Sequence, residues 1–162
     1  MSVVSIIGAG SWGTSLAVHL SKNGHEVRVW SLFQEEIDML SRELEHLDKL
    51  PGVKVPETVR FTADLAECLK DHEIIVLVVP SQTVRATCRL LAGHVSKGDI
   101  VVICSKGLEE ETGMRLSEVV LSEMSDVQPV ALYGPSHAEE VARGIPTTVV
   151  SASLNKEAAM KV

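Results

Sequence analysis

The stretch VVSIIGAGSWGTSLAVHL, residues 3–20, runs from β-branched apolar residues through three glycines into helix-forming residues. Gly8, Gly10 and Gly13 have the spacing G-x-G-x-x-G. Each glycine costs backbone entropy on folding, so three at one turn require a structural reason. In a strand–turn–helix unit the first glycine permits the tight turn and the second leaves open space beside the backbone. The third lets the helix pack close to the sheet.

The same turn predicts a binding site for phosphate groups. The N–H groups from Ser11 to Gly13 begin a predicted helix, where they have no helical acceptors and where the helix dipole is positive. The glycine spacing alone is weak evidence, because eleven glycines in 162 residues give chance matches. Here the motif follows a predicted strand and opens a helix near the start of a β-α-β unit. We therefore predict that the turn holds a dinucleotide.

Short apolar runs separated by helical patterns predict the rest of the fold. Several runs lack alternation between apolar and polar residues, which is typical of strands buried on both faces of a parallel sheet. We predict an α/β fold, a Rossmann-type doubly wound and mostly parallel sheet with helices on both faces. The predicted strands are 3–7, 26–30, 73–79, 99–104, 129–133 and 147–151, and the predicted helices are 11–22, 34–47, 64–70, 81–91 and 112–124. Residues 50–59 are predicted as a loop or edge strand.

We expect residues 1–162 to form one dinucleotide-binding domain. A helix begins at Asn155 and reaches Val162 without a cap, so we expect the natural sequence to continue beyond it. The net charge of −7 argues against a nucleic-acid partner. No apolar run approaches the roughly 20 residues needed to span a bilayer, so no membrane insertion is expected.

The cysteines and histidines give no sign of a metal site or a disulfide framework. Cys68, Cys88 and Cys104 are odd in number and unpatterned, which favours reduced thiols buried as small apolar groups. The six histidines show no ligand spacing, so no metal is expected. With no secretory leader recognised at the start of the chain, these features predict a cytoplasmic protein.

The sequence leaves the choice between NADP and NAD open. Dinucleotide sites that select NAD often carry an acid at the end of the second strand. Here that position reads Trp30-Ser31-Leu32, with no acid until Glu35, which permits a 2′-phosphate. A basic partner for that phosphate is also missing, because Arg28 lies two residues too early and is interpreted as a residue at the strand surface.

Polar residues also follow the later strands, at the edge where open α/β sheets bind ligands. Pro80 and Ser81 follow the fourth strand, and Ser81 is interpreted either as a ligand contact or as a helix cap. Lys106 follows the fifth strand and has the charge to meet a phosphate or a carbonyl oxygen. In Tyr133-Gly134-Pro135-Ser136, Gly134 and Ser136 are positioned to present an N–H and a hydroxyl to an anion, with a helix starting at Ser136. His137 is interpreted as exposed and non-catalytic.

Four segments together resemble the bacterial NAD(P)-dependent glycerol-3-phosphate dehydrogenases: GAGSWGTSLA, VVPS, SKGLEEETG and GPSHAEEVARGIPT. The segment LPGVKVPETV resembles that family's loop before the third strand, and the likeness runs along the whole chain. The resemblance implies an enzyme that interconverts dihydroxyacetone phosphate and sn-glycerol 3-phosphate with NADP or NAD. The product would feed phospholipid synthesis.

The resemblance also implies roles for individual residues. It assigns Ser11 and Trp12 to the cofactor pyrophosphate, Ala138 to the cofactor, and Lys106 to both cofactor and substrate. With the residues argued from the chain itself, the predicted cofactor-binding set is Gly8, Gly10, Ser11, Trp12, Gly13, Pro80, Lys106 and Ala138. The predicted substrate-binding set is Lys106, Gly134 and Ser136.

The chain departs from the family's pattern at several points. Leu32 stands where a basic residue is usual, His46 replaces an Asn, and Ser136-His137 stands where many members have Ser/Thr-Phe. The family's general-base lysine belongs to a helical carboxy-terminal domain without a counterpart here. We therefore expect no catalytic residue in this chain, little or no turnover by the 162 residues alone, and a possible homodimer only in the full enzyme.

Two other functions remain open at this point. One is another Rossmann dehydrogenase, of the ketopantoate or 3-hydroxyacid type, against which the segment SKGLEEETG counts. The other is a non-catalytic dinucleotide-sensing module, in which Lys106 would have no substrate to hold.

Overall fold

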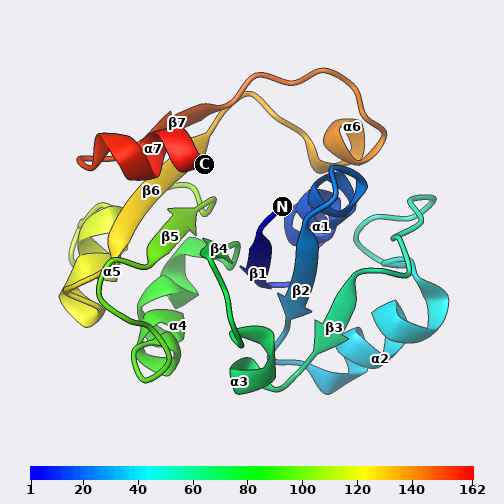
Figure 1. Cartoon of the computed structure of the whole chain (residues 1–162), viewed down its shortest axis with the longest axis horizontal. Coiled ribbons are helices and arrows are strands. Elements are labelled where there is room, and N and C mark those ends of the chain that lie inside the picture. Colours follow the sequence, from blue (N-terminus) through cyan, green and yellow to red (C-terminus); the bar gives the residue numbers. More distant parts are fainter.

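A seven-stranded sheet forms the centre of the computed structural model, which describes residues 1–162 (Figure 1). Its strand order is β3-β2-β1-β4-β5-β6-β7, and all pairs are parallel except β6 with β7. The strands are β1 Val3–Ile7, β2 Glu26–Trp30, β3 Arg60–Thr62, β4 Ile74–Leu77, β5 Ile100–Ile103, β6 Gln128–Tyr133 and β7 Val150–Ala152. The order reverses between β1 and β4, so a crevice opens at their carboxyl ends.

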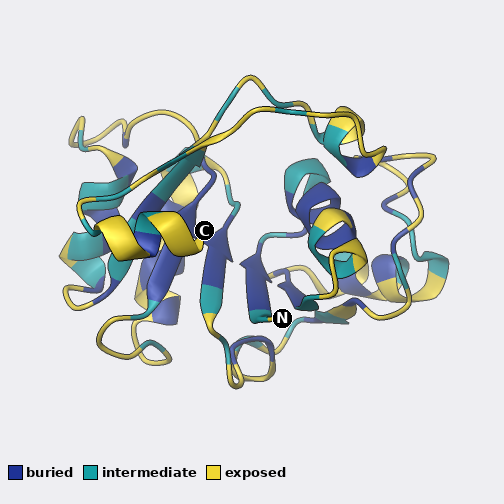
Figure 2. Ribbon diagram, turned by 45° about the horizontal axis from the view of Figure 1, so that its top comes forward, coloured by how far each residue is buried: buried dark blue, intermediate teal, exposed yellow.

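Helices cover both faces of the sheet, as predicted. They are α1 Ser11–Lys22, α2 Gln34–Glu43, α3 Leu65–Cys68, α4 Val84–Leu91 after a 3₁₀ turn η1 Ser81–Thr83, α5 Leu116–Glu123, α6 Ala138–Ala142 and α7 Lys156–Lys161. Figure 2 shows buried strands between helices whose outer surfaces are exposed. The doubly wound fold predicted from the apolar runs is confirmed.

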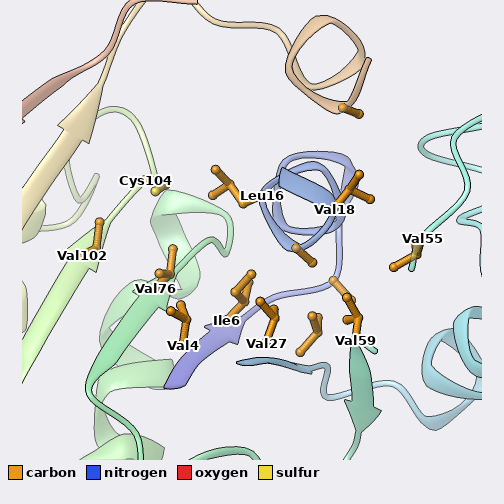
Figure 3. Packing of buried hydrophobic residues seen from close by; sticks show 14 of the residues in the cluster. Val4, Ile6, Leu16, Val18, Val27, Val55, Val59, Val76, Val102 and Cys104 are labelled. Atoms are coloured by element: carbon orange, nitrogen blue, oxygen red, sulfur yellow. The ribbon is translucent and has the colours of Figure 1, made fainter. Parts of the chain in front are cut away.

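Two separate hydrophobic clusters show why the strands lack alternation. Val4 and Ile6 of β1 point to one face, where they pack with Leu16 and Val18 of α1 (Figure 3). Ile7 joins the opposite cluster, which contains residues of α3, α4 and α5. Because side chains alternate along a strand, both faces of β1 carry buried apolar side chains.

Several predicted boundaries were wrong. The helix predicted over 34–47 ends at Glu43, because Leu44 adopts a left-handed conformation with φ 48°, and Leu47 is exposed. The helix predicted from residue 112 begins at Leu116, where the Glu118 carboxylate accepts hydrogen bonds from the Arg115 backbone N–H at 3.0 Å and from its guanidinium at 2.6 Å. The last strand is Val150–Ala152 instead of 147–151. β3 was not predicted, because its three residues form no apolar run. The last helix begins at Lys156, after the Asn155 N-cap.

Arg28 was also misplaced by the sequence interpretation. It is a buried residue of β2, 9 % exposed, and not a surface residue. Its guanidinium donates to the Glu26 carboxylate at 2.6 Å and to the Lys70 carbonyl. The Arg28 side chain therefore makes hydrogen bonds within the fold and is not among those that line the crevice.

The three cysteines are all buried and free, as predicted. Burial raises the pKa of each thiol to about 12, so they are protonated at neutral pH. No helix is long and apolar enough to cross a bilayer.

Candidate functional site

A cleft of about 880 Å³ lies at the carboxyl ends of the central strands. Its walls come from the Gly-rich turn, the ends of β2, β4 and β5, parts of α2 and α4, and the start of α6. All eight predicted cofactor residues line it: Gly8, Gly10, Ser11, Trp12, Gly13, Pro80, Lys106 and Ala138. Of the predicted substrate residues, Lys106 and Ser136 line it and Gly134 does not.

The three glycines of the turn meet different requirements. Gly8 has φ +117°, and a Cβ there would lie 2.4 Å from the Val78 carbonyl oxygen. A Cβ on Gly13 would lie 2.0 Å from the Gly8 carbonyl oxygen, so α1 starts in contact with the turn. A Cβ on Gly10 would meet no protein atom within 4 Å. Gly8 and Gly13 are thus required by the fold, whereas the space beside Gly10 is open to the cleft.

The start of α1 leaves hydrogen-bond donors without protein acceptors. Gly10 is the N-cap and offers no side-chain acceptor. The first backbone bond of the helix runs from Thr14 N–H to the Gly10 carbonyl at 2.9 Å, and the N–H groups of Ser11, Trp12 and Gly13 have no acceptor in the chain. Donors at a helix N-terminus, beside an open space, fit the oxygens of a pyrophosphate. The residues present therefore fit a dinucleotide.

The segment after β4 contributes Pro80 and Thr83 to the cleft wall, but Ser81 does not reach it. The Ser81 hydroxyl accepts a hydrogen bond from the Gln82 amide at 3.2 Å and makes no cap bond. The interpretation of Ser81 as a helix cap was therefore wrong, and its interpretation as a ligand contact stays a prediction. Its neighbour Gln82 connects this turn to the loop after β5, because its amide donates to the Leu108 carbonyl at 3.1 Å.

The loop after β5 holds Lys106 at the cleft. Its ammonium donates to the Gly134 carbonyl at 3.4 Å, and the side chain is exposed. Three residues further on, Glu109 accepts two hydrogen bonds from the Arg85 guanidinium, at 2.7 and 2.8 Å. Arg85 and then the Thr112 hydroxyl hold the pKa of the Glu109 carboxyl at about 2. This charged pair anchors the Lys106 loop to α4.

The segment after β6 reaches back over the sheet to α1, and its two limbs run side by side in Figure 1 and Figure 2. Gly134 is needed there because a Cβ would lie 2.3 Å from the Thr148 carbonyl oxygen of the returning limb. The Ser15 hydroxyl donates to the Ala138 carbonyl at 2.8 Å and joins the two helices. The prediction that this helix starts at Ser136 was wrong: α6 begins at Ala138, because His137 is still extended, with φ −109° and ψ 139°, and is the N-cap. His137 is exposed, as predicted.

Sequence reasoning missed two charged residues at the β2 end of the cleft. Glu36 of α2 and Lys49 of the following loop both line it. The Glu36 carboxylate accepts a hydrogen bond from the Ser31 hydroxyl at 2.5 Å. A carboxylate therefore does lie at the end of β2, although the residues immediately after the strand include none. The only sequence signal for this contact was that Glu36 follows Ser31 by five residues.

Cys104 also lines the cleft, but its raised thiol pKa makes it a poor nucleophile at neutral pH. No group of three or more His, Cys, Asp or Glu side chains is arranged to hold a metal ion.

The profile of one protein family, described as NAD-dependent glycerol-3-phosphate dehydrogenase N-terminus, matches residues 3–159. The chain belongs to this family. A glycerol-3-phosphate dehydrogenase [NAD(P)+] of Agathobacter rectalis is 49 % identical over 98 % of this chain and 47 % of its own length. One from Desulfitobacterium hafniense is 46 % identical over the whole chain and 46 % of its own length. The chain thus spans about half the length of the curated relatives it matches.

A solved structure supports the same family membership. The crystal structure of glycerol-3-phosphate dehydrogenase from Coxiella burnetii superposes with a TM-score of 0.93 at 33 % identity. The match covers 99 % of this chain and 49 % of that one. Nearly the whole of this chain therefore has the fold of about half of that structure.

Proposed function

We propose that this chain is the dinucleotide-binding part of a glycerol-3-phosphate dehydrogenase. The reaction is hydride transfer between NAD(P)H and dihydroxyacetone phosphate, which yields sn-glycerol 3-phosphate for phospholipid synthesis. The observation that carries the proposal is the start of α1, where three free N–H groups face open space beside Gly10. Membership of the family supplies the substrate class.

The residues of the cleft divide the work by position. The N–H groups of Ser11, Trp12 and Gly13 hold the pyrophosphate. Lys106 and Ser136 lie near one another at the other end, where an ammonium and a hydroxyl suit a phosphorylated ketone. The dinucleotide, when bound, supplies the hydride.

Proton transfer at the C2 oxygen of the substrate needs a general base within hydrogen-bond reach. We assign that role to no residue of this chain. Of the acids that line the cleft, Glu36 is engaged by three donors, and Glu139, at the start of α6, is exposed. We expect the base in the part of the protein that the relatives possess and this chain does not cover. Reduced, buried cysteines support a cytoplasmic site of action.

The experiment is a calorimetric titration of the 162-residue chain with NADH and with NADPH, beside the variants Lys106→Gln and Lys97→Gln. Lys97 is an exposed lysine outside the cleft and serves as the matched control. We expect dinucleotide binding by the parent and the control. Failure of both dinucleotides to bind would refute the proposal.

A second measurement separates an enzyme from a sensing module. A full-length protein that contains this chain is assayed for NADH oxidation by dihydroxyacetone phosphate. We expect turnover that Lys106→Gln abolishes and Lys97→Gln retains. Dinucleotide binding without turnover by the full-length protein would favour the sensing module instead.

A further inference from the structure

The loop that carries Lys106 is anchored on either side of that lysine to the segment that follows β4. Just before Lys106, the Ser105 hydroxyl donates to the Val79 carbonyl at 2.5 Å. Just after it, the loop backbone bonds to the side chain of Gln82. Between these anchors, Lys106 and Gly107 make no backbone–backbone hydrogen bond. The position of the Lys106 backbone therefore depends on the anchors at the two ends of this short span.

The Gln82 amide bonds to the loop through both of its polar atoms. Its nitrogen donates to the Leu108 carbonyl at 3.1 Å, and its oxygen accepts from the Glu110 N–H at 2.9 Å. Only this orientation of the amide satisfies both partners, because a carbonyl needs a donor and an N–H needs an acceptor. A residue of a parallel strand bonds to its neighbour in the same way, through one N–H and one C=O. The side chain thus continues the pairing of β4 with β5 beyond the ends of both strands.

Gln82 projects from a short turn whose own geometry is fixed. In the turn η1, the N–H and the hydroxyl of Thr83 both donate to the Pro80 carbonyl, at 2.9 and 2.8 Å. The Gln82 nitrogen also donates to the Ser81 hydroxyl at 3.2 Å. Pro80 and Thr83 line the cleft. The amide therefore ties the loop after β5 to a fixed part of the cleft wall.

The Arg85–Glu109 ion pair anchors the same loop in a different way. It joins two long side chains, so the backbone can shift while the charged groups stay in contact. Glu109 is 8 % exposed, and loss of its partner would leave a buried carboxylate unpaired and destabilise the fold. Gln82, in contrast, is exposed and bonds to the backbone directly. Its removal should displace Lys106 with little loss of stability, because exposed polar groups regain hydrogen bonds to water.

We propose that Gln82 is a positioning residue for Lys106. By fixing the loop backbone, Gln82 holds the Lys106 ammonium beside the Gly134 carbonyl, 3.4 Å away, where the phosphate of the substrate binds. Gln82 does not line the cleft, so it acts on the substrate only through Lys106. This inference rests on the proposed function, because it concerns the substrate contact made by Lys106.

The test is steady-state kinetics of a full-length protein that contains this chain, with the variant Gln82→Met beside the parent. Methionine is similar in length to glutamine but has no N–H donor and no carbonyl acceptor. We expect the KM for dihydroxyacetone phosphate to rise about fivefold, the effect of about one lost hydrogen bond. The KM for NADH and kcat should each stay within about twofold, because the lost contact contributes equally to the bound substrate and to the transition state.

Two further measurements distinguish positioning from a general structural role. Hydrogen exchange at the Glu110 amide should be faster in Gln82→Met, because that N–H loses its acceptor. Tm should stay within about 2 °C of the parent, because the Gln82 side chain is exposed.

Gln34→Met is the matched control. Gln34 is exposed, its amide donates to the Asp38 carboxylate at 2.7 Å, and it does not line the cleft. The kinetic constants of this variant should equal those of the parent, and a control with the same rise in KM would overturn the inference.

The remaining outcomes separate this inference from the proposed function. An active parent whose Gln82→Met variant keeps the KM for dihydroxyacetone phosphate, or keeps slow exchange at Glu110, overturns the inference and leaves the proposed function standing. A variant that loses several degrees of Tm, or in which kcat and both KM values change together, shows a merely structural role and also overturns the inference. A parent protein without turnover overturns both.

Discussion

Alanine at Gly10 and alanine at Gly13 are predicted to have opposite consequences, although the two positions share one turn. A Cβ at Gly13 would lie 2.0 Å from the Gly8 carbonyl oxygen, about 1 Å closer than the 3.0 Å below which real Cβ atoms essentially never lie. The Cβ is fixed to the backbone of α1 and the oxygen belongs to the backbone of the turn, so neither can rotate away. The start of α1 must shift from the turn by about that distance.

The cost can be worked out from this displacement. Overpacking a well-packed interior costs about 1–3 kcal/mol, and this site is at the upper end because backbone meets backbone. Alanine regains about 1 kcal/mol of helix propensity over glycine, so the net loss is about 2 kcal/mol. For a domain of this size that lowers Tm by about 4–8 °C.

Gly10 offers the contrasting case. Its φ of −64° and ψ of −174° suit alanine, and no protein atom lies within 4 Å of the added methyl group. The weaker N-cap and the smaller entropy of the unfolded chain offset one another, so stability changes by less than about 0.5 kcal/mol. The methyl group instead fills the space in front of the free N–H groups. NADH affinity should fall at least tenfold, or about 1.4 kcal/mol.

Differential scanning calorimetry gives Tm, and isothermal titration gives the NADH affinity of each variant. The expected pattern is normal Tm with poor binding for Gly10→Ala, and reduced Tm for Gly13→Ala. A Gly10→Ala chain that binds NADH like the parent would show that the open space beside Gly10 is not the pyrophosphate site. A Gly13→Ala chain with unchanged Tm would contradict the packing argument.

Three further outcomes are expected. Glu109→Gln lowers Tm at pH 7, and the difference in Tm from the parent shrinks as pH falls from about 4.5 toward 2. The reason is that the Glu109 side chain stabilises the fold only while its carboxylate is ionised. A difference in Tm that stays constant in a pH series of melts would contradict this. A thiol-reactive dye at pH 8 should label no cysteine in the native chain and three in denaturant, because in the folded chain each thiol is buried and has a pKa of about 12. Rapid labelling of the native chain would show that a thiol is accessible. Gly134→Ala places a Cβ 2.3 Å from the Thr148 carbonyl oxygen and should destabilise the chain by about 1–3 kcal/mol in urea unfolding, where no loss would mean that the α6 segment moves freely.

Local sequence was sufficient for the fold and for the location of the cleft. Gly8, Gly10 and Gly13 predicted the strand–turn–helix, and continuous apolar runs predicted strands buried on both faces, because both signals act over a few neighbouring residues. The position of Lys106 followed from the rule that ligands bind beyond the carboxyl ends of parallel strands. The family resemblance added Ala138, which no local signal singled out.

Boundaries set by tertiary contacts were the first to be missed. Apolar spacing continued the second helix to Leu47, but the chain turns at Leu44, so that Leu50 and Val55 enter the core. β3 forms without an apolar run because it pairs with β2 at the sheet edge. Arg28 is buried because carbonyl groups and Glu26 satisfy its guanidinium, which the strand's own residues do not reveal.

The contacts that refine the site were decided by tertiary structure alone. Glu36 reaches Ser31 because α2 returns across the end of β2, and Lys49 reaches Glu36 only after the left-handed turn that follows that helix. The absence of a Cβ at Gly134 allows the close approach of Thr148, which the sequence did not indicate. Local patterns specify which elements form and which end of the sheet is open. Which charged side chains meet there depends on the three-dimensional path of the loops, which local patterns do not encode.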